Sequence, residues 1–466
     1  MKKYIDSIYA ENMWINERQY KLLLSRVEED SLDKEAIDTI VKNAADSAKS
    51  NYKKVFKRMG NKKYYYKLDK CIYEVGREEN VIFKCKYKFQ RLAGNFKIVI
   101  SPVYNYEYHA DGSYNPWAKV ISAEDNQLVI PYTFNHEDMY IVTIFYVLDE
   151  EEMLLYSSNV YALEKDLFNL NFYKADLHMH TTYSDGYEPP ELVATAAREK
   201  GMDIIAVTDH NNFEGSVVAK ERARELGLNM TVILGEEFSL EYSPMHILAL
   251  GTDVAVDTKY KTKQIFELKE TQSIKEQIGN IEVDVDAYAG TQVLLDEVNR
   301  LGGVSVLAHP YWKPIGLNGY RMDTPEKLYG ELAKNKRFDG IELVSGSTLE
   351  EGHVSNLQTA LARDILNGFK DVPLIGITDS HYYSTDPICG RHYTIILSKT
   401  REGKDILSAL KEGKCVAVEI SGKNIMCYGD FRYVKLAQFL VDNYFPERDE
   451  FAYIEAKKVE ERILNK

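Results

Sequence analysis

The chain has 466 residues, of which 45% are hydrophobic and 12% aromatic, so it can bury a large apolar core and is not a disordered protein. This length is about three times a typical domain of ~150 residues, which predicts two or three domains. Charged residues make up 28% of the chain and interrupt every apolar run before about 20 residues, so we expect a soluble protein without a membrane span. The net charge of -14 would repel a polyanion, so contact with nucleic acid would need a local basic patch.

Two features of the chain predict a cytoplasmic protein. Lys2 and Lys3 could begin a secretion signal, but Asp6 and Glu11 interrupt the apolar stretch that such a signal needs. The cysteines are odd in number and have no CxxC spacing, which argues against a disulfide framework and against a thiolate zinc site. They are Cys71, Cys85, Cys389, Cys415 and Cys427.

Three sequence patterns follow one another along the chain. Residues 1–50 contain no Gly or Pro and carry apolar residues three and four positions apart, which predicts a short helical segment. Residues 51–168 contain short runs rich in Val, Ile, Tyr and Phe, such as NFKIVISPVY, separated by turn residues. This second pattern predicts an antiparallel β domain, most simply a sandwich.

The third pattern covers residues 169–425, where near-continuous apolar strands alternate with amphipathic helices, as in DIIAVTDH followed by SVVAKERARELG. Such strands are typical of parallel sheets that are buried on both faces. Six or seven of these units predict an α/β fold with a closed or nearly closed barrel. Residues 426–466 predict a C-terminal helical extension.

Six of the ten histidines in the chain lie near the ends of predicted barrel strands. In ADLHMHTTYSDG, His178 and His180 are two residues apart, so both imidazoles project from one face of an extended strand, with Asp185 in the loop beyond. The other candidates are His210, Glu237, His246, His309, Asp379 and His381. Parallel barrels hold their active sites at the C-terminal ends of the strands, so we expect these nine side chains to converge.

Imidazoles and carboxylates without thiolates are ligands that suit zinc, manganese or iron ions. Nine such donors exceed what one or even two ions need from a protein, so the sequence predicts two or three divalent transition metals. A binding protein whose metals are only structural is the less favoured alternative, because structural sites usually have fewer ligands.

Five sequence blocks, DLHMHTTYSDG, TDHN, GEE, AHP and DSH, resemble in this order the motifs of the polymerase and histidinol phosphatase (PHP) family of metal-dependent phosphoesterases. The resemblance covers roughly residues 172 to 420 and implies a distorted seven-stranded (βα) barrel with a trinuclear centre. It implies that one metal is held by His178, His180, Glu237 and Asp379, that Glu237 bridges to a second held by His246 and His309, and that the third is held by Asp185, His210 and His381. LGEEF offers two adjacent acids, and the family's register selects Glu237 over Glu236.

These motifs predict a hydrolase that acts on a small phosphomonoester or a nucleotide phosphodiester. A hydroxide between two metals is a nucleophile at neutral pH, and the same ions stabilise the charge of a phosphoryl transition state. The candidate catalytic residues are Asp185, Glu237, Asp379 and Arg391. The resemblance also reaches carbamate and ester metallohydrolases, so hydrolysis of carboxylic or carbamate esters on the same centre is the alternative function.

Two of the residues outside the metal motifs have two interpretations each. The guanidinium of Arg391 could meet phosphate oxygens, or Arg391 could be an ordinary exposed arginine. Glu342 ends a predicted strand and could orient a ligand histidine, or it could cap a helix or form an ion pair.

The predicted β domain contains a basic stretch, although the whole chain is acidic. Residues 51–91 contain 13 Lys and Arg against 4 Asp and Glu, interleaved with aromatic residues. Such a mixture could bind nucleic acid. We favour a structural explanation, since the alternation in FKCKYKF is what the solvent and core faces of one antiparallel strand require. We therefore expect a small-molecule phosphoester substrate, with nucleic acid as a less favoured partner and no membrane contact.

Overall fold

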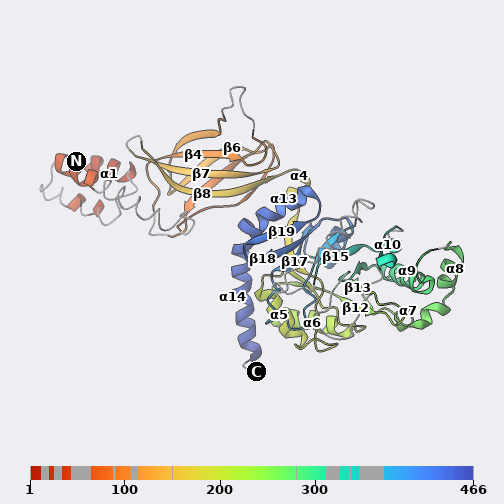
Figure 1. The fold of residues 1–466 in the computed structure, drawn as a ribbon. Helices are drawn as coiled ribbons and strands as arrows, with labels where there is room; N and C mark the ends of the chain where they lie inside the picture. The colour runs from red at the N-terminus through yellow and green to blue at the C-terminus, as the bar shows by residue number, and fades with distance from the viewer. Residues whose placement is uncertain are drawn as a thin grey trace. The chain divides into compact units, whose positions relative to one another are not determined.

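The computed structural model describes twelve ranges of the chain, and Figure 1 shows the elements that they form. The described residues are 2–11, 20–21, 23–25, 34–43, 65–87, 91–106, 114–148, 151–279, 281–310, 326–334, 337–345 and 372–464. Two compact units divide the chain, residues 1–168 and 169–466. The division into four parts that the sequence suggests stays a prediction. Within these ranges, no helix is both long enough and apolar enough to cross a membrane.

The first unit begins with helical residues, among them α1 (Lys2–Glu11). Ile5, Leu23 and Ile37 are buried and pack together, which explains the apolar spacing in this part of the sequence. The remainder of the predicted helical segment lies outside the described residues.

In its other described residues, the first unit forms two β-sheets and the short helix α4 (Lys165–Phe168). One sheet has the order β1 (Tyr66–Leu68), β3 (Glu78–Cys85), β6 (Gln127–Thr133). The other has the order β2 (Ile72–Glu74), β8 (Glu151–Leu163), β7 (Asp138–Leu148), β4 (Asn95–Pro102), β5 (Trp117–Ser122). All described pairs are antiparallel except β2 with β8, and residues of both sheets share one apolar core. The sandwich itself stays a prediction.

Strand β3 carries part of the basic stretch and shows the alternation that a half-buried strand requires. Val81 and Phe83 are fully buried, whereas Ile82 and Lys84 are partly exposed. For these residues, the mixture of lysine and aromatic side chains follows from burial of one strand face. Residues 51–64 and 88–90 of the basic stretch lie outside the described residues.

The second unit contains a six-stranded and a five-stranded sheet. The six-stranded order is β11 (Thr231–Ile233), β10 (Ile204–Ala206), β9 (Asn171–Asp176), β17 (His392–Ser398), β18 (Cys415–Ser421), β19 (Asn424–Tyr428). The five-stranded order is β12 (Gly235–Ser239), β13 (His246–Leu250), β14 (Val304–Leu307), β15 (Gly340–Val344), β16 (Leu374–Gly376). Residues of both sheets share one buried core.

Backbone bridges join the two sheets near the ends of their strands. Met179, beyond β9, pairs with Ser380, beyond β16, and His210, beyond β10, pairs with Glu237 of β12. The unit is an α/β structure with a curled half-barrel sheet, and the exact seven-stranded barrel stays a prediction. These bridges place the ends of β9, β10, β12 and β16 next to one another.

The pairing of β12, β13 and β14 differs from the parallel pairing that the sequence pattern suggests, because these three strands are antiparallel. The turn between Ser239 and His246 is too short for the helical crossover that a parallel pair requires. A hairpin therefore replaces one βα unit at this position.

Helices cover the second unit. They are α5 (Pro190–Glu199), α6 (Glu214–Leu226), α9 (Val285–Arg300), α10 (Glu326–Lys334), α12 (Gly403–Lys411) and, between β13 and α9, α7 (Thr258–Lys261), η1 (Lys263–Glu267) and α8 (Lys269–Gln277). The chain ends with α13 (Phe431–Phe439), the π-helical turn η2 (Leu440–Tyr444) and α14 (Phe445–Leu464), which is the long blue helix in Figure 1. Helix α14 packs on α5, where Glu455 pairs with Arg198 at 3.3 Å.

Candidate metal centre

The nine candidate ligands come from six strands of the second unit or from the loops that follow them. They are His178, His180 and Asp185 after β9, His210 after β10, Glu237 in β12, His246 at the start of β13, His309 after β14, and Asp379 and His381 after β16. Eight of them form three overlapping groups, and within each group all ligand atoms lie within 4.8 Å of one another. The ninth, His309, contacts Glu237.

The first group contains His178, His180, Glu237 and Asp379. His178 Nε2 lies 3.2 Å from Oε2 of Glu237 and 3.2 Å from Oδ1 of Asp379. His180 Nε2 lies 3.3 Å and 3.1 Å from the same two oxygens. The two Nε2 atoms are themselves 3.2 Å apart. Two nitrogens and two oxygens therefore face one small volume.

The other oxygen of Glu237 faces a second set of imidazoles. Oε1 lies 2.9 Å from Nδ1 of His246 and 3.0 Å from Nε2 of His309. His210 approaches the carboxylate as well, with its Nδ1 3.1 Å from Oε2. Glu237 is fully buried between these groups, in the position that a bridging carboxylate would occupy.

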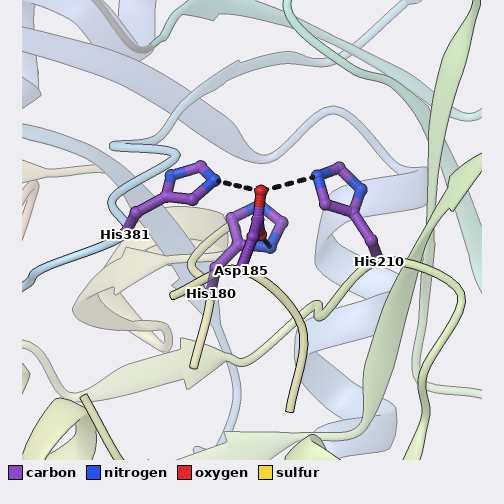
Figure 2. Close-up of side chains that lie close together, drawn as sticks. All are labelled: His180, Asp185, His210 and His381. Carbon is purple, nitrogen blue, oxygen red and sulfur yellow. Dashed lines mark ion pairs between the residues drawn. The ribbon is translucent and has the colours of Figure 1, made fainter. Parts of the chain in front are cut away.

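The third group is more open to solvent and is shown in Figure 2, where Asp185 lies between His381 and His210. Oδ2 of Asp185 lies 3.3 Å from Nε2 of His381 and 3.8 Å from Nε2 of His210. Oδ1 lies 3.7 Å from Nδ1 of His180. The Asp185 side chain is 56% exposed, so this group lies on the accessible side of the centre.

The surroundings of the Glu237 carboxylate show whether these donors fit a cation. Its Oε2 is buried and accepts no hydrogen bond from the described residues, although imidazole nitrogens of His178, His180 and His210 lie within 3.3 Å. A buried carboxylate oxygen without a donor is costly. A divalent ion would contact this oxygen and the nitrogen lone pairs at once, so the donor set fits transition-metal ions.

A buried acid outside the ligand groups holds two of the histidines in place. Oε1 of Glu342, in β15, lies 2.8 Å from Nδ1 of His178, and its Oε2 accepts a 2.6 Å hydrogen bond from the backbone N–H of His309. His309 has a φ of 25°, in a region that non-glycine residues rarely adopt, so its backbone needs such support. Of the two interpretations from sequence, the orienting role agrees with these contacts.

Sequence reasoning missed a second supporting acid, Asp209. Its carboxylate accepts hydrogen bonds of 2.7 Å from the backbone N–H and the hydroxyl of Thr181 and from the hydroxyl of Ser184. These contacts anchor the loop that carries Asp185. The available signal was its position next to His210 in the TDH block.

Glu236, the acid next to Glu237, faces a different partner. Because successive residues of a strand point to opposite sides, Glu236 points away from the ligand groups. Its carboxylate pairs with the Lys261 ammonium from α7 and accepts a 2.9 Å hydrogen bond from the N–H of Val256. Glu236 is fully buried and Lys261 nearly so.

Arg391 is not among the side chains that the structure brings together. It is exposed, and its backbone bonds to Ile388 and Ile420. Across the described ranges, no hydrogen bond or ion pair joins the Arg391 guanidinium to a candidate ligand.

The mixture of imidazoles and carboxylates shifts pKa values strongly. Burial alone would lower the pKa of His178, but the carboxylates of Glu237 and Glu342 raise it well above its usual value. Burial also opposes protonation of His180, yet its carboxylate partners raise the pKa of His180 to about 9. At His210 burial dominates and lowers the pKa to about 4. In the metal-free chain, protons therefore occupy part of the space that a cation would fill.

Comparison with known proteins identifies a known domain within the second unit. The model of the PHP domain matches residues 176–367, which contain His178, His180, Asp185, His210, Glu237, His246 and His309. Residues 176–367 of this chain form a PHP domain. An uncharacterized protein of Methanocaldococcus jannaschii is 27% identical over 195 residues, which are 40% of this chain and 88% of that protein.

Other relatives match this chain over shorter stretches. A 5'-3' exoribonuclease of Salmonella typhimurium is 38% identical over 82 residues, which are 17% of this chain and 28% of the enzyme. The chain thus spans less than a third of that relative. A solved two-domain protein of Bacteroides vulgatus that contains a predicted PHP-like metal-dependent phosphoesterase is 20% identical, with a TM-score of 0.37 over 53% of this chain and 65% of that one.

Proposed function

We propose that this chain is a hydrolase of phosphoester bonds that uses divalent transition-metal ions held by its PHP domain. The observation that carries the proposal is Glu237, a fully buried carboxylate whose two oxygens face imidazoles from opposite sides. The relationship to an exoribonuclease, an enzyme that cleaves phosphodiesters, supports the reaction class.

The ligands that we propose fall into three sets. The first set is His178, His180, Glu237 and Asp379, the second is Glu237, His246 and His309, and the third is Asp185, His210 and His381. When bound, zinc, manganese or iron ions supply Lewis acidity, which activates water at neutral pH and offsets charge on the reacting group. Glu237 belongs to two sets, so its carboxylate would fix the spacing between two ions.

Carboxylates of the protein would bind the ions, and other side chains would bind the substrate. Glu237 is fully buried and Asp379 nearly so, and both keep their carboxylates ionised, because the imidazole of His178 lowers both pKa values against the effect of burial. Asp185 also has a lowered pKa, chiefly through its bond to His381, and it lies on the accessible side. We propose that substrate enters past Asp185 and that the guanidinium of Arg391 binds one of its phosphate oxygens.

A phosphoester suits such a centre better than a carboxylic or carbamate ester. Several divalent ions in one site stabilise a multiply charged phosphoryl group more than a singly charged tetrahedral intermediate. We also propose a small phosphoester rather than a nucleic-acid chain as substrate, because no lysine or arginine of the described residues forms a hydrogen bond or ion pair with a candidate ligand.

The test compares hydrolysis of phosphomonoesters, phosphodiesters and carboxylic esters by the full chain with Mn²⁺ or Zn²⁺ added. We expect phosphoesters to be hydrolysed faster, and we expect Glu237→Gln to abolish this activity. Turnover confined to carboxylic or carbamate esters would overturn the proposal, as would activity that survives in the Glu237→Gln variant.

A further inference from the structure

Two exposed tyrosines lie on the loops that carry Asp185 and His381 of the candidate metal centre. Tyr187 is 78% exposed and Tyr382 is 44% exposed, and their ring centroids are 6.2 Å apart with the planes inclined by 64°. Tyr187 follows Asp185 by two residues, and Tyr382 follows His381 directly. Each ring therefore belongs to a loop that also carries a candidate ligand of the third group.

The two loops are held tightly against each other and against the ligands. The backbone N–H of Tyr187 donates a 2.7 Å hydrogen bond to the carbonyl of His381. Gly186 presses on the neighbouring strand end, since a Cβ at this position would lie 2.5 Å from the carbonyl carbon of His180. The position of the aromatic pair relative to Asp185 and His381 is thus set by the same contacts that place the ligands.

The exposure of the ligands shows from which side a substrate arrives. The side chains of Asp185, His381 and His210 are 56%, 29% and 24% exposed, whereas those of Glu237 and His178 are fully buried. A phosphoester that reaches the ions from solvent therefore approaches through the third group, beside which the tyrosine loops lie. Its organic part would remain outside the ions, near these rings.

The side chains around the third group favour one kind of organic group. In the described ranges, no lysine or arginine pairs with Asp185, His210 or His381, whereas two tyrosine rings lie on the loops that carry Asp185 and His381. Tyrosine rings present apolar faces on which another planar ring can stack, with little dependence on its substituents. Exposed single tyrosines are common, whereas this contacting pair lies on two loops that each carry a ligand of the accessible third group.

We infer that Tyr187 and Tyr382 form a subsite that stacks an aromatic ring on the organic part of the phosphoester substrate. This inference rests on the proposed function and adds the substrate class. An aryl group and a nucleobase share the planar ring that the subsite would recognise, and the experiment below distinguishes them.

The test measures binding rather than turnover, with the full chain loaded with Mn²⁺ and two phosphonates that are not hydrolysed. Calorimetry should show phenylphosphonate binding about fivefold or more tightly than methylphosphonate, as one stacked ring provides. Tyr187→Ala and Tyr382→Ala should each reduce this preference, whereas Tyr187→Phe should keep it. Tyr453→Ala, at a tyrosine of α14 that is 48% exposed, is the matched control and should change nothing.

The outcomes separate this inference from the proposed function. Equal affinity for the two phosphonates, or a preference that survives both alanine variants, overturns the subsite while leaving phosphoester hydrolysis intact. If no phosphoester is hydrolysed, the proposed function fails, and a ring preference that depends on Tyr187 would still support the subsite. A last measurement compares how strongly adenosine 5'-monophosphate, phenyl phosphate and ribose 5-phosphate compete with phenylphosphonate for binding. If adenosine 5'-monophosphate competes more strongly than both other compounds, the ring is a nucleobase. If adenosine 5'-monophosphate and phenyl phosphate compete equally, the subsite accepts aryl groups in general.

Discussion

His178 and Glu342 are joined by a 2.8 Å contact between Nδ1 and Oε1, and both side chains are fully buried. A carboxylate at Nδ1 keeps a proton on that nitrogen, so when an ion displaces the second proton, the Nε2 lone pair of His178 faces Glu237 and Asp379. Because the other Glu342 oxygen holds the backbone of His309, one acid supports ligands of two proposed metal sets.

We predict that Glu342→Gln weakens metal binding about 10- to 100-fold, which is the usual effect of losing a partner behind a ligand histidine. The measurement is a titration of the metal-free chain with Mn²⁺, followed by electron paramagnetic resonance. Glu282→Gln, at an exposed glutamate paired with Lys327, is the control. Unchanged affinity in Glu342→Gln would show that Glu342 only fills space.

The two neighbouring acids of β12 should respond differently to substitution. Glu237→Gln should lose the two ions that its carboxylate joins, as measured by elemental analysis of the purified variant. Glu236→Gln should keep its metals but lose about 3–5 kcal/mol of unfolding free energy, because Lys261 is left as an unpaired buried charge. Similar metal loss from the two variants would mean that the assignment of Glu237 is wrong.

Metal uptake should release protons at neutral pH. Burial opposes protonation of His180, but Asp379 and Glu237 raise its pKa to about 9, so the metal-free chain is protonated there below that pH. An ion must displace this proton, so the apparent affinity should rise as pH increases from neutral toward about 9 and level off above it. Calorimetry in two buffers that differ in ionisation enthalpy would count the protons, and an affinity that does not change with pH would contradict the assignment.

Arg391→Ala tests the proposed contact with phosphate. If the guanidinium binds the substrate equally in the ground state and the transition state, the KM for a phosphomonoester should rise about 5- to 10-fold with kcat nearly unchanged. Arg391→Lys should recover part of the loss. An effect on kcat alone, or no effect at all, would contradict the proposed phosphate contact and favour the interpretation of Arg391 as an ordinary exposed arginine.

The second unit should keep its metals without the first. Its apolar cores consist of residues after 169, and all nine candidate ligands belong to it. A chain beginning at residue 169 should therefore bind the same number of ions and hydrolyse small synthetic phosphoesters at a similar rate. Loss of metal from this shorter chain would show that the two units fold together.

The amino-acid sequence by itself determined the features that depend on local spacing. The two-residue spacing of His178 and His180 places both imidazoles on one side of an extended segment, and the alternation around Phe83 separates core from solvent in β3. The positions of histidines and acids at strand ends were likewise sufficient to predict a metal centre, because parallel strands bring their ends together.

Only the tertiary structure decided which partners these side chains meet. Alternation along β12 puts Glu236 and Glu237 on opposite sides and the family resemblance selects Glu237 as the ligand, but neither identifies Lys261 as the partner of Glu236. Glu342 is 164 residues from His178, so no local pattern could select the orienting role over a helix cap. The antiparallel pairing of β12, β13 and β14 also depends on chain connections, since apolar strand patterns do not specify direction. Periodicity determines which residues share a face, whereas contacts between distant segments depend on how the sheets curl around one core.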